Sequence, residues 1–270
     1  MGNFTLWVAG PGLDQGGAAV INELIRYTHE MGWGQAIYNG ASIPIMIAVP
    51  AMFLAYRKRY GIPALWAILA SVIFYYGVMA ALRVSVLLEN GFQNFSGMNI
   101  IKTFVYVPLI CILLSKILKK PIALVLSYAG PVVLVWHIIG QSVCPFLGCC
   151  AGIPCKWGIW NPALNERVFP IQWLICLVTL AILIAMLRYE KQKDYAGDGK
   201  SYPVMLIVYG SARFFLEFLR QREKVFLGVS EIGLHALFMV LVGTVWLFAA
   251  YEIKVEKERR AELTRQMRGQ

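Results

Sequence analysis

Residues 209–220 combine a phenol, a carboxylate and two guanidinium groups at helical spacing. Tyr209, Arg213, Glu217 and Arg220 are separated by four, four and three residues, so on a helix with 3.6 residues per turn they share one face. A guanidinium group matches phosphate oxygens in a bidentate fork. An arginine beyond the Arg213–Glu217 pair therefore predicts a site for an anionic phospholipid headgroup. The alternative is an ion pair that only holds two helices together.

A second polar face precedes this stretch in the chain. His137, Gln141, Cys144 and Gly148 are spaced by four, three and four residues, which places them on one side if a single helix continues through them. An imidazole can take a proton near neutral pH, but a histidine inside a helix is often only a hydrogen-bonded packing residue. Both interpretations of His137 stay open at this point.

Four cysteines crowd into twelve residues. Cys144, Cys149, Cys150 and Cys155 are separated by glycine and proline residues, which predicts a tight, irregular loop. Their spacing matches no zinc pattern built from C-x-x-C pairs, so we expect no metal there. Disulfide bonds that tie the loop, or reactive thiols of a redox relay, are the remaining interpretations.

The amino-acid composition indicates the environment in which these residues lie. Of the 270 residues, 59% are hydrophobic and 15% are charged, and the mean hydropathy is +0.61. A typical soluble domain has about 25% charged residues, and a water-soluble chain could not hide this much apolar surface. The composition excludes an ordinary soluble enzyme and predicts a membrane protein.

Apolar runs of about 20 residues, the length that crosses a hydrocarbon core, predict an all-α polytopic membrane protein with about seven transmembrane helices. The predicted spans are Ala36–Tyr56, Pro63–Leu88, Ile100–Leu118, Pro121–Gly140, Phe169–Leu187, Tyr202–Leu219 and Ile232–Tyr251. Residues 209–220 thus belong to the sixth span, and the cysteine loop follows the fourth.

The net charge of +10 predicts the orientation. Sixteen of the 25 lysine and arginine residues lie in alternate connections and in the C-terminal tail, and such an excess is typical of the cytoplasmic side. We therefore expect the N-terminus outside and the C-terminus in the cytoplasm. We expect residues 1–35 to form an extracytoplasmic segment. The apolar spacing within Ala18–Met31 predicts a helix that lies on the membrane surface or packs as a cap on the outer face. Residues 36–251 form the transmembrane domain and 252–270 a basic cytoplasmic tail.

Three segments together resemble the prolipoprotein diacylglyceryl transferase family. Residues 209–220 are similar to its Y-G-x-x-R-F-x-x-E-x-x-R signature at every fixed position. Residues 140–152 resemble a cysteine-bearing version of its G-R-x-G-N-F-x-N-x-E-x-x-G segment, and residues 169–173 resemble its H-P-x-Q-L segment. The order of the segments also agrees, and the resemblance extends over roughly residues 36–250.

The resemblance implies transfer of a diacylglyceryl group from phosphatidylglycerol to a thiol of an exported lipoprotein precursor, in the plasma (inner) membrane of a bacterium. Arg213 and Glu217 would be catalytic, Glu217 by orienting the arginines. Arg220, Tyr209, Gln141, Gln172 and Gly140 would bind substrate.

The chain departs from the family pattern at the acceptor side. Gln141 stands at the family's arginine position, the family's asparagine and glutamate are absent from residues 140–152, and residues 90–97 contain no counterpart of its H-G-G segment. These departures predict altered activation of the acceptor, with His137 as the replacement base.

Two alternatives remain. One is a lipid-binding membrane protein without catalysis, and the other is a redox or metal-handling protein that acts through its cysteines. For the transferase we expect no cofactor and no nucleic-acid partner.

Overall fold

The computed structural model describes residues 17–89, 100–192 and 200–268. The predicted connection at residues 90–97 lies outside the described residues. So do residues 1–16 of the N-terminal segment, residues 193–199 and residues 269–270.

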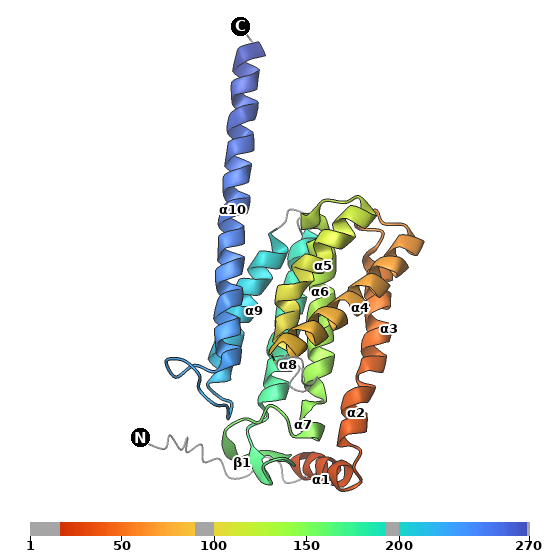
Figure 1. The fold of residues 1–270 in the computed structure, drawn as a ribbon, viewed down its shortest axis with the longest axis vertical. Coiled ribbons are helices and arrows are strands. Elements are labelled where there is room, and N and C mark those ends of the chain that lie inside the picture. Colours follow the sequence, from red (N-terminus) through yellow and green to blue (C-terminus); the bar gives the residue numbers. More distant parts are fainter. Residues whose placement is uncertain (1–16, 90–99, 193–199, 269–270) are drawn as a thin grey trace.

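Most of the described chain is helical (Figure 1). In chain order the elements are α1 (Gly17–Glu30), α2 (Gly34–Gly40), α3 (Ser42–Tyr56), α4 (Ala64–Glu89), η1 (Ile100–Lys102), α5 (Thr103–Leu118), α6 (Ile122–Ser142), α7 (Cys144–Leu147), β1 (Pro154–Asn161), β2 (Glu166–Val168), α8 (Ile171–Gln192), α9 (Ser201–Glu217) and α10 (Glu231–Arg268).

The helical segments correspond to the predicted spans. Five described segments are long and apolar enough to cross a membrane. These are Gly34–Tyr56, Ala64–Leu88, Ile122–Leu147, Ile171–Lys191 and Glu231–Ala249. The predicted third and sixth spans are helical too, as α5 and α9, but contain only 16 and 17 residues. The chain is a multi-pass membrane protein of helices, while the number of seven spans and the orientation of the termini stay predictions.

Helix α6 is the central element of the bundle. It packs against α3, α5, α8 and α9, and most of its side chains are buried. Lys119 ends α5 in the left-handed conformation, with φ of 52°, and Pro121 begins α6 two residues later. This sharp turn places α6 beside α5, and the last two turns of α6 carry His137 and Gln141 into the interior.

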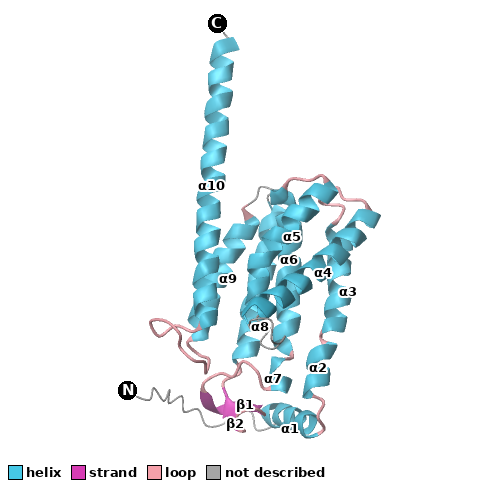
Figure 2. Ribbon diagram, viewed as in Figure 1, coloured by secondary structure: helices cyan, strands magenta, loops and turns pink. Residues whose placement is uncertain are grey.

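A two-stranded hairpin departs from the all-α prediction. Strands β1 and β2 pair antiparallel, at the same end of the bundle as α1 and α7 (Figure 2). The Oδ1 atom of Asn161 accepts the backbone N–H groups of Ala163 and Leu164, both at 3.0 Å, which closes the turn between the strands. The sequence analysis missed the hairpin because the segment contains no long alternating pattern.

The helix predicted at Ala18–Met31 is present as α1. It packs as a cap on the hairpin. Asn22 accepts the backbone N–H of Trp160 at 2.7 Å, and the Arg26 guanidinium lies 4.3 Å from the centre of the Trp160 ring. Ile25 is buried in the same small core. Leu24 and other apolar side chains on the opposite face remain exposed.

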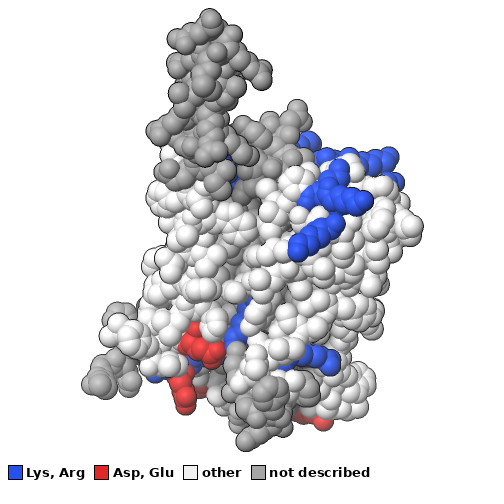
Figure 3. All heavy atoms as spheres, turned by 45° about the horizontal axis from the view of Figure 1, so that its top comes forward, with Lys and Arg blue, Asp and Glu red and all other residues white. Residues whose placement is uncertain are grey.

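Basic side chains mark the opposite end of the bundle, which we call the basic end (residues 57–62 and 119–121). Lysines and arginines gather there in Figure 3. The two turns lie side by side, because the Nζ atom of Lys120 is 3.5 Å from where a Cβ at Gly61 would stand. We call the other end, with residues 144–168, the cysteine end. Helix α10 begins near the cysteine end and extends past the basic end (Figure 1). Its helical course to Arg268 confirms that the tail extends the last helix.

Candidate active site

Helix α9 carries the predicted polar face into the protein. Tyr209, Arg213 and Glu217 are buried on this helix. The prediction that Arg220 continues the same helix face was wrong, because α9 ends at Glu217 and Phe218 caps it. Arg220 nevertheless returns to Glu217 through the turn that follows and is itself buried. The spacing identified the right residues, but a turn rather than a helix positions the last one.

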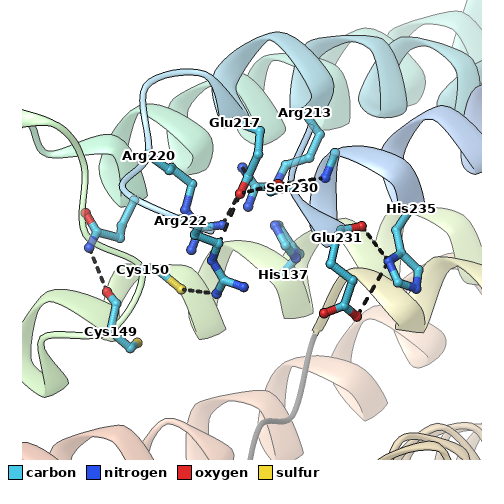
Figure 4. Close-up of polar contacts among 12 residues, drawn as sticks. His137, Cys149, Cys150, Arg213, Glu217, Arg220, Arg222, Ser230, Glu231 and His235 are labelled. Atoms are coloured by element: carbon cyan, nitrogen blue, oxygen red, sulfur yellow. Dashed lines mark hydrogen bonds and ion pairs between the residues drawn. The ribbon is translucent and has the colours of Figure 1, made fainter. Parts of the chain in front are cut away.

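Glu217 is the centre of this cluster (Figure 4). Its Oε2 atom lies 3.1 Å from Nη1 of Arg213 and accepts a hydrogen bond from Nη1 of Arg220 at 3.2 Å. Its Oε1 atom accepts the hydroxyl of Ser230 at 3.1 Å, and Nε of Arg222 lies 4.0 Å away. One carboxylate thus faces three guanidinium groups. Both oxygens of Glu217 are thus engaged by neighbouring side chains.

Several guanidinium donors in this cluster have no acceptor among the described residues. They are Nε and Nη1 of Arg213 and Nε and Nη2 of Arg220, of which Nη1 of Arg213 approaches Glu217 only as an ion pair. Both side chains are at least 94% buried. A buried donor without a partner costs about 1–3 kcal/mol, and more on a charged group. Donors of this kind, in a cluster with excess positive charge, fit an anionic ligand.

A pocket is lined by Glu217, Arg220 and Arg222 of this cluster. Its lining residues come from the end of α9 and from the segment before α10. The pocket has a volume of about 50 Å³, enough for a few water molecules. The lining residues are Phe214, Glu217, Phe218, Arg220, Arg222, Lys224, Gly228, Val229 and Ser230.

A larger groove of about 330 Å³ lies near this pocket, between α5 and α10. Lys102, Tyr106, His235 and Phe238 contribute to its lining. The Nζ atom of Lys102 is 3.6 Å from Glu231, the residue after Ser230. The groove and the pocket therefore meet the same short segment at the start of α10, and Phe238 is exposed on the outside of the bundle.

His137 lies beside Tyr209 in the interior. Its Nε2 atom shares a hydrogen bond of 2.5 Å with the Tyr209 hydroxyl, and Tyr209 stacks on Phe104. Its Nδ1 atom has no partner among the described side chains and backbone. The imidazole and the phenol, predicted to act separately as a base and a headgroup ligand, thus form a pair. Gln141, one turn further, is buried with its Oε1 atom unpartnered in the described chain.

Three of the four clustered cysteines come together. The Sγ atoms of Cys144, Cys149 and Cys150 lie within 4.8 Å of one another, and all are free thiols. Cys155, in strand β1, is not part of this group. We call these three the thiol cluster. The described cysteines form no disulfide bond, so the interpretation of a disulfide-tied loop is not borne out, and that of free thiols remains.

The turn that carries the thiol cluster is built by backbone contacts. Gly148 has φ of 72°, and a Cβ there would lie 2.8 Å from the backbone nitrogen of Ala163. Gln172 donates its amide N–H to the carbonyl of Cys149 at 2.9 Å, and the Cys144 thiol contacts the carbonyl of Gly140 at 3.4 Å. Gln172 and Gly140, predicted to bind substrate, therefore position the cysteine turn in the described structure.

Backbone pairing joins the cysteine turn to the arginine segment. The N–H of Ile153 donates to the carbonyl of Leu219, and the N–H of Gln221 donates to the carbonyl of Ala151, both at 3.0 Å. This pairing brings Nη2 of Arg222 to 3.9 Å from Sγ of Cys150 (Figure 4). The two groups of residues that the sequence suggested separately therefore lie next to each other.

The Cys150 thiol is the most acidic member of the cluster. Hydrogen bonds from Cys144 and Cys149 lower its pKa well below the ordinary value, and the positive charges of Arg220 and Arg222 lower the pKa further, against the opposing effect of burial. The thiolate is the reactive form of cysteine. The surroundings of Cys150 therefore favour the reactive form more than those of an ordinary cysteine.

The sequence analysis missed Arg222, Lys224 and Ser230. Ser230 caps α10 by accepting the backbone N–H of Gly233 at 3.1 Å, so a serine directly before an acidic first helical residue was the signal available. Arg222 and Lys224 lie in an irregular connection, where no periodicity reveals which way a side chain faces.

Two comparisons with known proteins bear on this site. The family model described as prolipoprotein diacylglyceryl transferase matches residues 36–249. A protein of Clostridium perfringens (strain 13 / Type A), named phosphatidylglycerol--prolipoprotein diacylglyceryl transferase 2, is 28% identical over 127 residues, which are 44% of this chain and 48% of that protein. The match spans about half the length of this relative. Because the family model covers most of the chain, including α9 and the cysteine turn, the chain belongs to the prolipoprotein diacylglyceryl transferase family.

Proposed function

We propose that this protein transfers the diacylglyceryl group of a phospholipid, phosphatidylglycerol, to a thiol acceptor such as the cysteine of an exported lipoprotein precursor. The reaction takes place in the bacterial plasma membrane, with the cysteine end outside and the basic end in the cytoplasm. The observation that carries the proposal is the set of buried Arg213 and Arg220 donors that have no acceptor among the described residues. The name of the Clostridium perfringens relative supports the choice of donor and acceptor.

Arg213 and Arg220 bind the phosphate of the donor lipid, with Glu217 holding both groups in place. As the bond between glycerol carbon and phosphate oxygen breaks, negative charge grows on the phosphate. Guanidinium groups fixed in advance in a site with little water stabilise that charge strongly. The groove between α5 and α10 is suited to an acyl chain, because apolar side chains line much of it and, like the pocket, it meets the segment at the start of α10.

Release of glycerol phosphate tests this proposal. The full-length protein in proteoliposomes receives phosphatidylglycerol labelled in its headgroup glycerol, together with a cysteine peptide. We expect Arg213→Ala to lower release by at least about 100-fold. Arg83→Ala, which changes an exposed arginine of α4, is the matched control and should retain the activity. Full activity of Arg213→Ala would contradict the assignment.

A lipid-binding protein without catalysis is the second candidate. The pairing of His137 with Tyr209 favours it, because that imidazole nitrogen is already occupied. Labelled lipid that stays bound without headgroup release during prolonged incubation would support the binding protein. Growth of cells depleted of their own diacylglyceryl transferase, after expression of this protein, would support the enzyme.

A further inference from the structure

The thiol cluster has the dimensions of a metal site. Tetrahedral zinc with Zn–S bonds of about 2.3 Å holds its sulfur ligands about 3.8 Å apart. The Sγ atoms of Cys144, Cys149 and Cys150 already lie within 4.8 Å of one another, so small side-chain rotations complete the geometry. Thiolates are the ligands that select soft or borderline metals such as Zn²⁺ and Cu⁺.

The protein holds the three sulfurs close together at a cost in backbone energy. Cys150 has φ of 63°, a conformation that costs a non-glycine residue about 1–3 kcal/mol and that persists only where the surroundings enforce it. The enforcing contacts are the amide of Gln172 on the Cys149 carbonyl and the pairing of residues 151–153 with residues 219–221. The sulfurs are thus placed by contacts to two other parts of the chain.

The cluster offers three ligands rather than four. Among the described histidine, cysteine, aspartate and glutamate residues, the group contains only these three. Structural zinc sites are closed by four protein ligands, whereas catalytic sites have three and leave one position for water or substrate. The count therefore indicates a metal ion with an open position.

The surrounding charge suits a thiolate-bound divalent ion. Three thiolates and one Zn²⁺ carry a net charge of −1. Arg222 lies 3.9 Å from Cys150, and the Arg220 backbone pairs with that of Gly152, two residues after Cys150. These cations offset the negative charge of the metal–thiolate group, and the same arginine segment lines the anion pocket. The open metal position and the phosphate site are neighbours.

We propose that Cys144, Cys149 and Cys150 bind one Zn²⁺ ion, whose open position takes the thiol of the acceptor as a thiolate. The inference rests on the proposed function and supplies its acceptor side. A thiol that coordinates zinc is deprotonated, so the metal generates the nucleophile without a protein base.

The reaction then balances as an S-alkylation. The acceptor thiol loses its proton when it binds the metal. Its sulfur forms a bond to the glycerol carbon of the donor lipid, and the C–O bond to the phosphate breaks with its electron pair staying on the phosphate oxygen. Arg213 and Arg220 face the charge that develops there. The products are the diacylglyceryl thioether, glycerol phosphate and the proton released from the thiol.

Cobalt spectroscopy tests the metal site on the whole protein. The reduced, metal-free chain in detergent is titrated with Co²⁺ without oxygen, and sulfur-to-cobalt absorption should saturate at one equivalent. We expect Co²⁺ affinity to fall by more than about 10-fold in each of three variants, Cys144→Ser, Cys149→Ser and Cys150→Ser. Loss of a residue that only hydrogen-bonds to a metal ligand already lowers metal affinity by about that factor. Cys155→Ser is the matched control, from strand β1 directly after the cysteine turn, and should bind like the wild type. Equal loss in all four variants would overturn the site.

X-ray absorption spectroscopy of the zinc-loaded wild type tests the same site without any variant, so the result does not depend on whether a cysteine variant folds. We expect three sulfur neighbours at about 2.3 Å and one lighter neighbour. Four sulfurs, three sulfurs without a fourth neighbour, or no zinc retained by the reduced protein would each overturn the proposal. So would a disulfide within the cluster that persists in the active protein.

A thiol probe tests the open position. A lipoprotein signal peptide with its cysteine should intensify the sulfur-to-cobalt absorption, and the same peptide with serine should not. If the cysteine peptide leaves the sulfur-to-cobalt absorption unchanged, the metal does not bind the acceptor thiol and the proposal is refuted. Release of labelled glycerol phosphate separates this inference from the proposed function. Full release by metal-free protein would refute the zinc role alone, whereas a thiol-responsive metal site without release would refute the transferase alone.

Discussion

The two ends of the bundle each bury a carboxylate, but they surround it differently. At the basic end, Glu190 accepts the hydroxyl of Tyr60 at 2.8 Å, and the same hydroxyl lies 3.2 Å from the carbonyl of Ser127. At the cysteine end, Glu217 faces the guanidinium groups of Arg213 and Arg220 at 3.1 and 3.2 Å. Burial alone does not distinguish these two residues.

The partners distinguish them. Burial, and then the neighbouring Glu190, raise the pKa of Tyr60, so its hydroxyl remains a neutral donor that ties α8 to the turn before α4. Around Glu217, the cations exceed the carboxylates, and donors of Arg213 and Arg220 lack acceptors among the described residues. At the basic end, the buried hydrogen bond from the neutral Tyr60 phenol to Glu190 holds two parts of the fold together. A buried cluster with donors left over is suited to a ligand.

The largest difference between the ends should follow from removing each carboxylate charge. Glu217→Gln leaves buried arginines without their counter-charge, and loss of one member of a buried ion pair costs about 3–5 kcal/mol. Glu190→Gln keeps an acceptor for the Tyr60 hydroxyl, so we expect the smaller loss, about 1–3 kcal/mol. Thermal unfolding in detergent measures both. Headgroup release should fall in Glu217→Gln and persist in folded Glu190→Gln, and equal activity in the two variants would contradict the comparison.

A smaller effect should follow from crowding the junction between the cysteine turn and α8. A Cβ at Gly152 would lie 2.2 Å from the carbonyl oxygen of Phe169, so Gly152→Ala must displace backbone, at a cost of about 1–3 kcal/mol. Gly40→Ala is the control, because a Cβ there meets nothing within 4 Å. The melting temperature should fall only for Gly152→Ala, accompanied by weaker Co²⁺ binding. Unchanged cobalt affinity would show that the junction does not position the thiols.

The smallest expected change compares two phenols. Tyr209→Phe and Tyr60→Phe each remove one buried hydroxyl, worth about 1 kcal/mol. The first leaves Nε2 of His137 without its partner inside the candidate site, whereas the second acts at the basic end. We expect the two variants to unfold at similar temperatures, and headgroup release to fall only in Tyr209→Phe. That result would separate a role in the candidate site from a role in stability. Reduced release in both would indicate that the two ends are coupled.

The sequence predicted the helices well because a membrane span has a simple requirement. Its backbone must bond internally and its side chains must be apolar over about 20 residues, and both show in composition. The helical face of Tyr209, Arg213 and Glu217 was predictable for a similar reason, since local periodicity fixes it. The place of Arg220 was not, because the helix ends first.

The cysteines show the limit of spacing. Four thiols in one loop gave no reason to separate Cys155 from the others, and the spacing argued against a metal. Contacts from distant residues decide the outcome. The Gln172 amide, 23 residues away, holds the Cys149 carbonyl, and the strand-like pairing with residues 219–221 fixes the rest. The proposed metal site could not have been inferred without these long-range contacts.

By itself, the sequence determined that the chain is a helical membrane protein, which family its motifs resemble, and which helix carries a charged face into the interior. Those properties depend on composition and on neighbours within a few turns. Only the tertiary structure decided that three thiols gather beside the arginine segment, that His137 pairs with Tyr209, and that donors of Arg213 and Arg220 have no acceptor in the described chain. These facts depend on backbone pairing and packing between segments far apart in the chain, which no local pattern records.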